Sequence, residues 1–152
     1  MSKQLLTYQE FKNVADFTDN VTDGRFNKYE KISEETYLRE LIGDDLVTAI
    51  KAGTYDELIP YVKNCLAHEI ELYFMMVGSI VVTGIGAVQR DSTYSKDPQW
   101  TMLENKINMV KDILRRYETL LRETIEVGDY TDYNDETAIT KKVNFTMTSV
   151  GD

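Results

Sequence analysis

Hydrophobic positions recur at helical spacing over most of the chain, most clearly in its second half. Asp97 and Pro98 predict an N-cap and a first helical residue, and the pattern that follows ends near Gly128. Apolar positions between them alternate by four and three residues, which is typical of a helix that packs on a helical core. They are Leu103, Ile107, Val110, Leu114, Tyr117, Leu121 and Ile125, with Met102, Met109, Ile113 and Leu120 expected to widen the stripe.

The first half of the chain predicts shorter helices. Thr7 and Glu10 have the spacing of a capping box, in which each side chain satisfies a backbone N–H of the first turn. A short helix is therefore expected to begin there. The turn-rich residues 16–26 are expected to end it, and a longer helix is expected from Asn27 to a stop at Gly43.

Two further helices are expected before the glycine-rich region. One covers residues 44–52 and closes at Gly53, and Thr54 with Glu57 then repeats the capping-box spacing. Pro60 is expected in the first turns of the next helix or as its first residue. The segment from residue 61 to a stop at Gly78 is apolar around much of its circumference, so we expect it at the centre of the core.

The stretch "IVVTGIGAV", residues 80–88, has a different character. It is β-branched and free of charge, and Gly84 and Gly86 permit a bend or a bulge. We expect an extended arm or hairpin between two core helices, suited to contact with another protein. Two other interpretations were weighed. A nucleotide loop lacks the third glycine of the dinucleotide fingerprint and the lysine of a P-loop, and an uncharged window from Leu72 to Gln89 approaches the length of a membrane span.

The C-terminal residues alternate like a strand. Residues 129–136 are acidic and polar, and after Ile139 the side chains of Val143, Phe145 and Met147 fall on one face. A solitary strand is marginal on its own, so this one needs a partner from this chain or from a neighbour. We therefore divide the chain into a helical bundle over residues 1–128 and an acidic linker with a strand tail over residues 129–152.

The composition narrows the function. The chain has 152 residues with 17 Lys and Arg against 26 Asp and Glu, a formal net charge of −9, which argues against nucleic-acid binding as the main activity. A single cysteine cannot form an internal disulfide, and the N-terminal residues have no apolar segment typical of a secretory signal. Synthesis in the cytoplasm is the expectation.

Residues capable of metal or catalytic chemistry are few. His68 and Glu71 lie three apart on a predicted helix, but no second such pair exists, so a hydrogen-bonded structural histidine is favoured over a metal ligand. Cys65 could pair with His68 as a nucleophile, although a thiol on an apolar helix face is more often a small hydrophobic residue. The acidic residues of the linker do not fit a calcium loop and indicate a solvated segment. We expect no enzyme activity, no cofactor and no metal.

Four stretches together resemble the head–tail connector proteins of tailed bacteriophages, also called adaptor or head-completion proteins. They are "LTYQEF", "ISEETYLRELIGDDLVTAIKAG", "YDELIPYVKNCLAHEIELYF", and "VVTGIGAVQRDS" leading into "WTMLENKINMVKDILRRYETLLRETI". They cover roughly residues 5 to 127. The Glu35-Thr36 pair departs from an Ala-Gln pair frequent in such proteins, and this leaves the subgroup open.

The resemblance implies a mainly α fold, a small helical bundle that assembles as a homo-oligomeric ring, a dodecamer, below the portal protein. Such a ring is a structural part of the virion that extends the DNA channel and offers a platform to tail or further connector proteins. DNA would pass the lumen without specific binding, and no membrane is involved. The residues expected at interfaces with other chains are Ile80, Val82, Gly84, Ile85, Gly86, Val88, Ile139, Val143, Phe145 and Met147.

Overall fold

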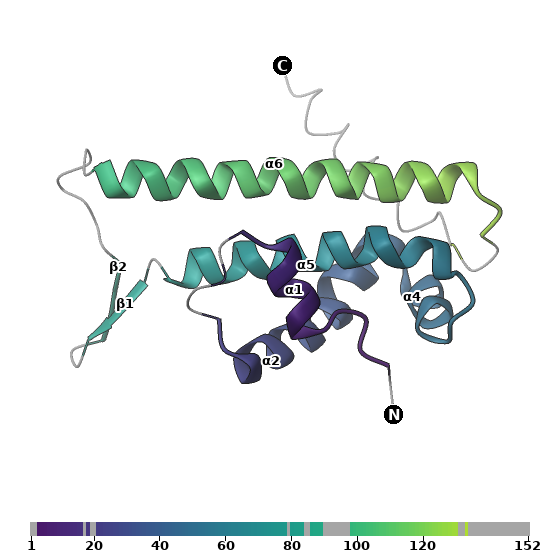
Figure 1. The fold of residues 1–152 in the computed structure, drawn as a ribbon, viewed down its shortest axis with the longest axis horizontal. Helices are drawn as coiled ribbons and strands as arrows, with labels where there is room; N and C mark the ends of the chain where they lie inside the picture. Colours follow the sequence, from purple (N-terminus) through teal and green to yellow (C-terminus); the bar gives the residue numbers. More distant parts are fainter. Residues whose placement is uncertain are drawn as a thin grey trace, which may run out of the picture.

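The fold is mainly α, as the sequence predicts, and is built around two long helices (Figure 1). The computed structural model describes residues 3–16, 18, 21–78, 80–83, 86–89, 98–130 and 133. Its elements are α1 (Tyr8–Val14), α2 (Asp23–Ser33), the π-helical turn η1 (Glu34–Leu38), α3 (Arg39–Ile42), α4 (Asp44–Lys51), the 3-10 turn η2 (Asp56–Leu58), α5 (Ile59–Gly78), β1 (Ile80–Thr83), β2 (Gly86–Gln89) and α6 (Pro98–Val127).

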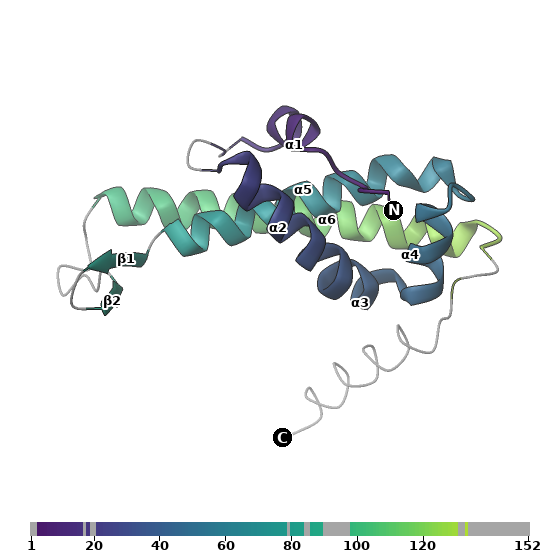
Figure 2. The same ribbon diagram turned by 90° about the horizontal axis from the view of Figure 1, so that it is seen from below.

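Helix α5 is the central element of the fold. Helix α6 runs beside it along one side, and α1 to α4 lie on its other side; Figures 1 and 2 agree on this arrangement. A helix covered on two sides must be apolar around most of its circumference, which explains the wide hydrophobic surface of residues 61–78. The expectation that this segment is central in the core is confirmed, and so is its end at Gly78.

Three of the predicted helix boundaries are set by local chemistry. The Thr7 side chain accepts from the Glu10 backbone N–H while the Glu10 carboxylate accepts from the Thr7 backbone N–H at 2.9 Å, so the capping box of α1 is confirmed. Gly43 ends α3 with φ of 90°, and Gly53 follows α4 with φ of 84°. Residues that carry a side chain rarely adopt such φ values, whereas glycine adopts them without strain.

Helix α2 begins earlier than the sequence predicts. Residues 23–26 were expected in a turn, but the helix starts at Asp23, and its N-cap Thr22 makes no side-chain capping bond. Packing replaces the cap: the ring of Phe26 is fully buried and stacks on Phe11 with ring centroids 5.0 Å apart. Burying a phenylalanine stabilises the fold by about 2 kcal/mol, which outweighs the roughly 1 kcal/mol penalty for Gly24 in a helix.

The second predicted capping box is wrong. The N-cap of the 3-10 turn η2 is Tyr55 rather than Thr54, and it makes no side-chain capping bond. Helix α5 follows directly, with Pro60 as its second residue, a position where no backbone N–H is needed. The start of α6 at Pro98 and its end before Gly128 agree with the sequence pattern; Asp97 lies outside the described residues.

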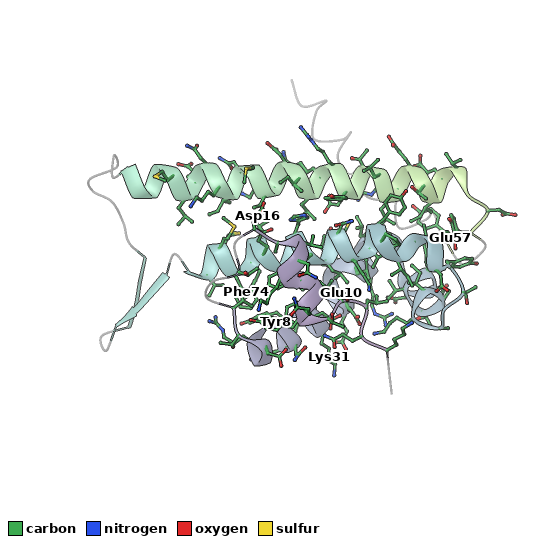
Figure 3. All side chains as sticks on the ribbon, in the orientation of Figure 1. Tyr8, Glu10, Asp16, Lys31, Glu57 and Phe74 are labelled. Carbon is green, nitrogen blue, oxygen red and sulfur yellow. The ribbon has the colours of Figure 1, made fainter. Side chains whose placement is uncertain are left out.

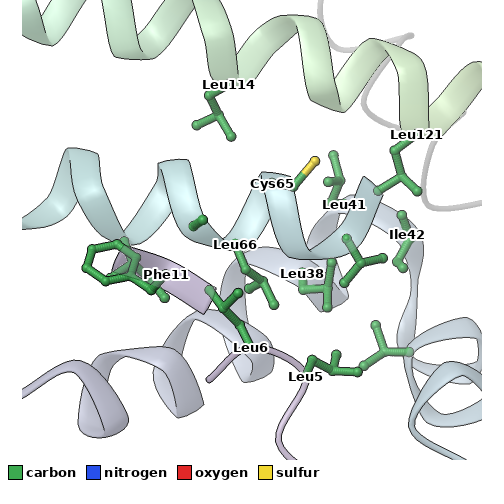
Figure 4. Packing of buried hydrophobic residues seen from close by; sticks show 14 of the residues in the cluster. Leu5, Leu6, Phe11, Leu38, Leu41, Ile42, Cys65, Leu66, Leu114 and Leu121 are labelled. Carbon is green, nitrogen blue, oxygen red and sulfur yellow. The ribbon is translucent and has the colours of Figure 1, made fainter. Parts of the chain in front are cut away.

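The core is one cluster that spans α1 to α6 (Figure 4). Leu6 and Phe11 from the N-terminal region pack with Leu66 of α5, and Leu114 and Leu121 close the opposite side from α6. On α6 the prediction of a wide stripe is wrong in part. The row that alternates by four and three residues from Leu103 to Ile125 is buried or half-buried. Three of the residues expected to widen it are exposed, namely Met102, Met109 and Leu120.

The segment between α5 and α6 contains a two-stranded antiparallel ladder. Ile80 pairs with Gln89 and Thr83 with Gly86. Figure 1 shows β1 and β2 beyond the end of α5 rather than packed along the helices. The C-terminal strand expected at residues 143–147 lies outside the described residues.

Candidate functional site

The most strongly built polar site of the bundle lies under the N-terminal segment. Two carboxylates of consecutive turns, Glu30 of α2 and Glu34 of η1, are buried with exposed fractions of 3% and 4%. Glu34 accepts the backbone N–H of Leu5 at 2.9 Å, and Glu30 accepts that of Leu6 at 3.3 Å. Lys51 of α4 forms an ion pair with Glu34. These bonds join the N-terminal segment, the α2–η1 helix and α4.

The charge balance of this cluster is set by burial. Two carboxylates and one ammonium group share a site from which water is excluded, so one negative charge lacks a counter-ion when both carboxylates are ionised. Burial, followed by the hydrogen bond that protonated Glu30 donates to Glu34, raises the pKa of Glu30 to about 8. Glu30 therefore holds a proton at neutral pH, and the ion pair of this cluster is the one between Lys51 and Glu34.

A second buried cluster surrounds the only histidine. His68 Nδ1 lies 2.9 Å from the Glu71 carboxylate, which also accepts the backbone N–H of Asp16 at 2.9 Å. The His68 ring stacks on Tyr117 of α6 with centroids 5.5 Å apart. His68 thus links α5 to α6 while Glu71 fastens the end of α1, near the labelled Asp16 in Figure 3. Within the described residues no group of three or more histidine, cysteine or acidic side chains is placed to hold a metal ion.

Cys65 lies in a third cluster, on the face of α5 toward α6. The Tyr37 hydroxyl donates to Glu118 at 2.8 Å and so joins η1 to α6. Cys65 is fully buried, and burial followed by the charge of Glu118 raises the pKa of its thiol to about 12. Because the thiolate is the nucleophile, this cysteine is unreactive at neutral pH, and the structure favours its interpretation as a small hydrophobic residue.

Tyrosines gather where the chain leaves α6. Tyr130 meets Tyr55 edge to face with centroids 5.0 Å apart, and Tyr61 and Tyr133 pack on the same side of the core. Burial and the nearby carboxylate of Glu57 raise the pKa of Tyr130, and Figure 3 shows Glu57 at this end of the molecule. The cluster holds Tyr130 and Tyr133 against the core.

These clusters fasten helices to one another. Buried side-chain nitrogen and oxygen atoms in the described part of the chain all have a hydrogen-bond partner. Two surface hollows are open and shallow: one is lined by Arg115, Arg116, Thr119 and Leu120, and the other by Glu35, Thr36, Arg39, Glu40, Gly43 and Asp44. The second hollow contains the exposed Arg39–Asp44 ion pair at 3.1 Å, and no lining residue of either hollow is a buried nucleophile.

The predicted interface residues fall in two groups. The backbones of Ile80 and Val82 lie in β1, and those of Gly86 and Val88 lie in β2. Their contacts with other chains stay a prediction. The remaining predicted interface residues lie outside the described part: Gly84, Ile85, Ile139, Val143, Phe145 and Met147.

The two other interpretations of the glycine stretch fit the backbone less well. Gly86 begins a strand, so the Gly-x-Gly sequence does not lead into a helix N-terminus of the kind that binds phosphate. The uncharged window is divided between the end of α5 and the β1–β2 ladder. Among the described helices, none combines the length and the apolar composition needed to cross a membrane.

Comparison with known proteins gives no relative. No protein-family model matches the chain, and neither a curated protein nor a solved structure matches it.

Sequence reasoning missed the Glu30–Glu34 cluster, although a signal for it exists. Phe26, Glu30, Glu34 and Leu38 follow one another at intervals of four, so the two carboxylates share a helix row with two fully buried hydrophobic residues. Acidic residues on such a row indicate buried, partnered groups rather than a solvated face.

Proposed function

We propose that this protein is a structural subunit of a head–tail connector ring of a tailed bacteriophage, without enzyme activity of its own. The observation that carries the proposal is the β1–β2 ladder, which lies beyond the end of α5 and has strands of only four residues each (Figure 1). An isolated two-stranded hairpin is marginally stable in water. A subunit that carries one gains stability when a neighbouring chain completes the sheet.

The tail supplies a complementary element. Residues 143–147 have a strand pattern, and a strand needs a ladder partner. In the proposed ring the tail strand of one copy adds to the open edge of the β1–β2 ladder of the next copy. Main-chain hydrogen bonds then give affinity, and Val143, Phe145 and Met147 provide the side-chain contacts. This contact is head to tail, so repetition around an axis closes a ring.

The remaining features suit this role. The buried clusters of Glu30, His68 and Tyr37 hold the helices together, as a structural subunit requires. A net charge of −9 suits a channel through which DNA must pass without being held. In the proposed assembly the ring lies between the portal protein and the tail proteins.

Cross-linking between copies tests the proposal. A photo-reactive residue at Val82 or Val88 in concentrated protein is expected to give cross-links to residues 138–150 of another copy. The same residue at Glu35, which is exposed on the bundle, is the control and should give none to that segment. Native mass and electron microscopy in the presence of a purified portal ring are expected to show closed rings. Cross-links from Val82 and Val88 that stay within one chain at all concentrations would disprove the strand exchange.

A further inference from the structure

Helix α6 carries a second row of apolar side chains beside the one that packs on α5. Met102, Met109, Leu120 and Val127 have exposed fractions of 58%, 44%, 45% and 90%, and Ile113 is half-buried. With Lys106, Arg116 and Glu123 these positions alternate by four and three residues from Met102 to Val127. We call this row of eight residues the outer seam.

The outer seam lies about 100° around the helix from the buried row. Met109 precedes the buried Val110 by one residue, and Leu120 precedes the buried Leu121 in the same way. One residue advances an α-helix by about 100°. Helix α5 can cover only one of two rows placed so far apart, and the exposed fractions identify the outer seam as the uncovered one.

The spacing of the outer seam is that of a helix–helix contact. Alternation by four and three repeats every seven residues, which keeps one face toward a partner helix. The row extends over about 38 Å at about 1.5 Å per residue. Scattered exposed hydrophobic residues need no explanation, but four of them on one heptad row, together with the half-buried Ile113, indicate a partner helix of similar length.

The charges of the outer seam identify that partner. We propose that the outer seam packs against the outer seam of a second copy, with the two α6 helices antiparallel about a twofold axis between Leu114 and Arg115. In this register Lys106 lies opposite Glu123 of the other copy, and twofold symmetry makes this ion pair twice. The apolar residues meet each other: Met102 lies opposite Val127, and Met109 opposite Leu120.

Other arrangements of the two helices are less favourable. In a parallel, in-register pair Lys106, Arg116 and Glu123 each face their own like charge, which destabilises the contact. An antiparallel slip of one heptad in one direction places Lys106 opposite Arg116. The slip in the other direction places Glu123 opposite Ile113 and moves Lys106 beyond the end of α6 at Val127.

Arg116 is the one charged residue of the outer seam that has no oppositely charged partner in this register. It lies opposite Ile113 near the twofold axis, where its aliphatic stem can cover the isoleucine while the guanidinium group stays in water. The residue limits the strength of the contact, so Arg116→Leu should tighten the pair by about tenfold, as expected for one further apolar pair made twice.

This inference does not depend on the proposed ring. A twofold contact closes at two copies, whereas a ring needs a head-to-tail contact, so the two interfaces use different surfaces and can fail separately. The pair concerns α6, and the ring concerns the β1–β2 ladder and the tail.

Exchange of the two seam charges is the test. Sedimentation equilibrium of the full chain should show a reversible dimer. Lys106→Glu and Glu123→Lys should each weaken it by about tenfold or more, because each change replaces two attractive pairs by two repulsive ones. The double variant restores both pairs in exchanged order, and its dimer should lie within about threefold of the wild type. A double variant as weak as the single ones would overturn the proposal.

Disulfide formation tests the register independently. Met109→Cys with Leu120→Cys places two thiols about 16 Å apart within one helix, too far to join, but opposite each other between copies. Mild oxidation should give a covalently linked dimer, while the buried Cys65 stays reduced. Asn108→Cys with Thr119→Cys, at the same separation but off the seam and exposed, is the control and should give no covalently linked dimer. Equal linkage in both variants would contradict the proposal. So would a strictly monomeric wild type, which would result if residues 134–152 covered the seam within one chain.

Discussion

At the scale of single residues, the buried carboxylates decide how the N-terminal segment is held. Leu5 and Leu6 are buried hydrophobic residues, but their backbone N–H groups also need acceptors once water is excluded. Glu34 and Glu30 provide these acceptors, and Lys51 balances one of the charges. The same arrangement makes the stability of the fold sensitive to pH through Glu30.

The pH dependence has a defined sign. Glu30 has a pKa of about 8 in the folded chain against an ordinary value of 4.5. The folded state therefore binds more protons than the unfolded state between these values, and the free energy of unfolding should fall as pH rises through this range. The contribution of Glu30 is at most about 1.4 kcal/mol per pH unit.

Glu30→Gln should flatten this dependence, because an amide can still accept from Leu6 and cannot ionise. The pH dependence of the free energy of unfolding is measured by urea unfolding at several pH values between about 5 and 8. Glu35→Gln is the matched control, since Glu35 is exposed in the neighbouring turn. If the slope for Glu30→Gln equals that of the wild type, Glu30 is not the group responsible.

At the scale of the elements, some helix boundaries are set by local sequence signals and others by packing between elements. The capping box at Thr7, the glycine at position 43 and the proline at position 98 act through their immediate neighbours, so the sequence predicted these boundaries. The start of α2 at Asp23 depends on Phe26 reaching Phe11, a contact between separate elements. Sequence reasoning has no access to such a contact, and the turn residues before Phe26 gave the wrong boundary.

Two glycines of the same region should respond in opposite ways to alanine. Gly43→Ala is expected to lower the free energy of unfolding by about 1 to 3 kcal/mol, because its φ of 90° strains any side chain. Gly24→Ala is expected to raise it by up to about 1 kcal/mol, because Gly24 lies inside α2 and a Cβ there meets no atom within 4 Å. Thermal or urea unfolding compares them. A stabilised Gly43→Ala variant would show that the α3–α4 turn can relax.

At the scale of the whole molecule, the sequence predicted the helical bundle well because its core follows a regular period. Residues at the centre of α5 and along α6 recur at helical spacing, and burial follows that spacing. The sequence predicted His68 as a hydrogen-bonded residue, but the bonds that join separate elements escaped prediction because their partners lie far apart in the chain: Leu5 with Glu34, Asp16 with Glu71, and Tyr37 with Glu118. Pairing over such separations is a property of the fold rather than of any local pattern.

Deletion of residues 138–152 should leave the bundle folded. The described core extends to Ile125 and the tyrosine cluster to Tyr133, so the deletion removes no residue of the described core. Far-ultraviolet circular dichroism is expected to keep its helical signal, while ring formation, followed by native mass, is lost. An unfolded truncation would instead place the tail in the core of its own chain.

The buried thiol of Cys65 allows the separation of α5 from α6 to be measured without an engineered probe. Its thiol is fully buried between α5 and α6 and has a pKa of about 12, so an alkylating reagent should modify it only when these helices separate. Followed by mass spectrometry at low and high reagent concentration, the modification rate reports first the equilibrium and then the rate of that opening. Modification as fast as that of a free thiol would mean that α6 leaves α5 continually. Slow modification of the Cys65 sulfur would instead give the lifetime of the contact between α5 and α6, the two longest helices.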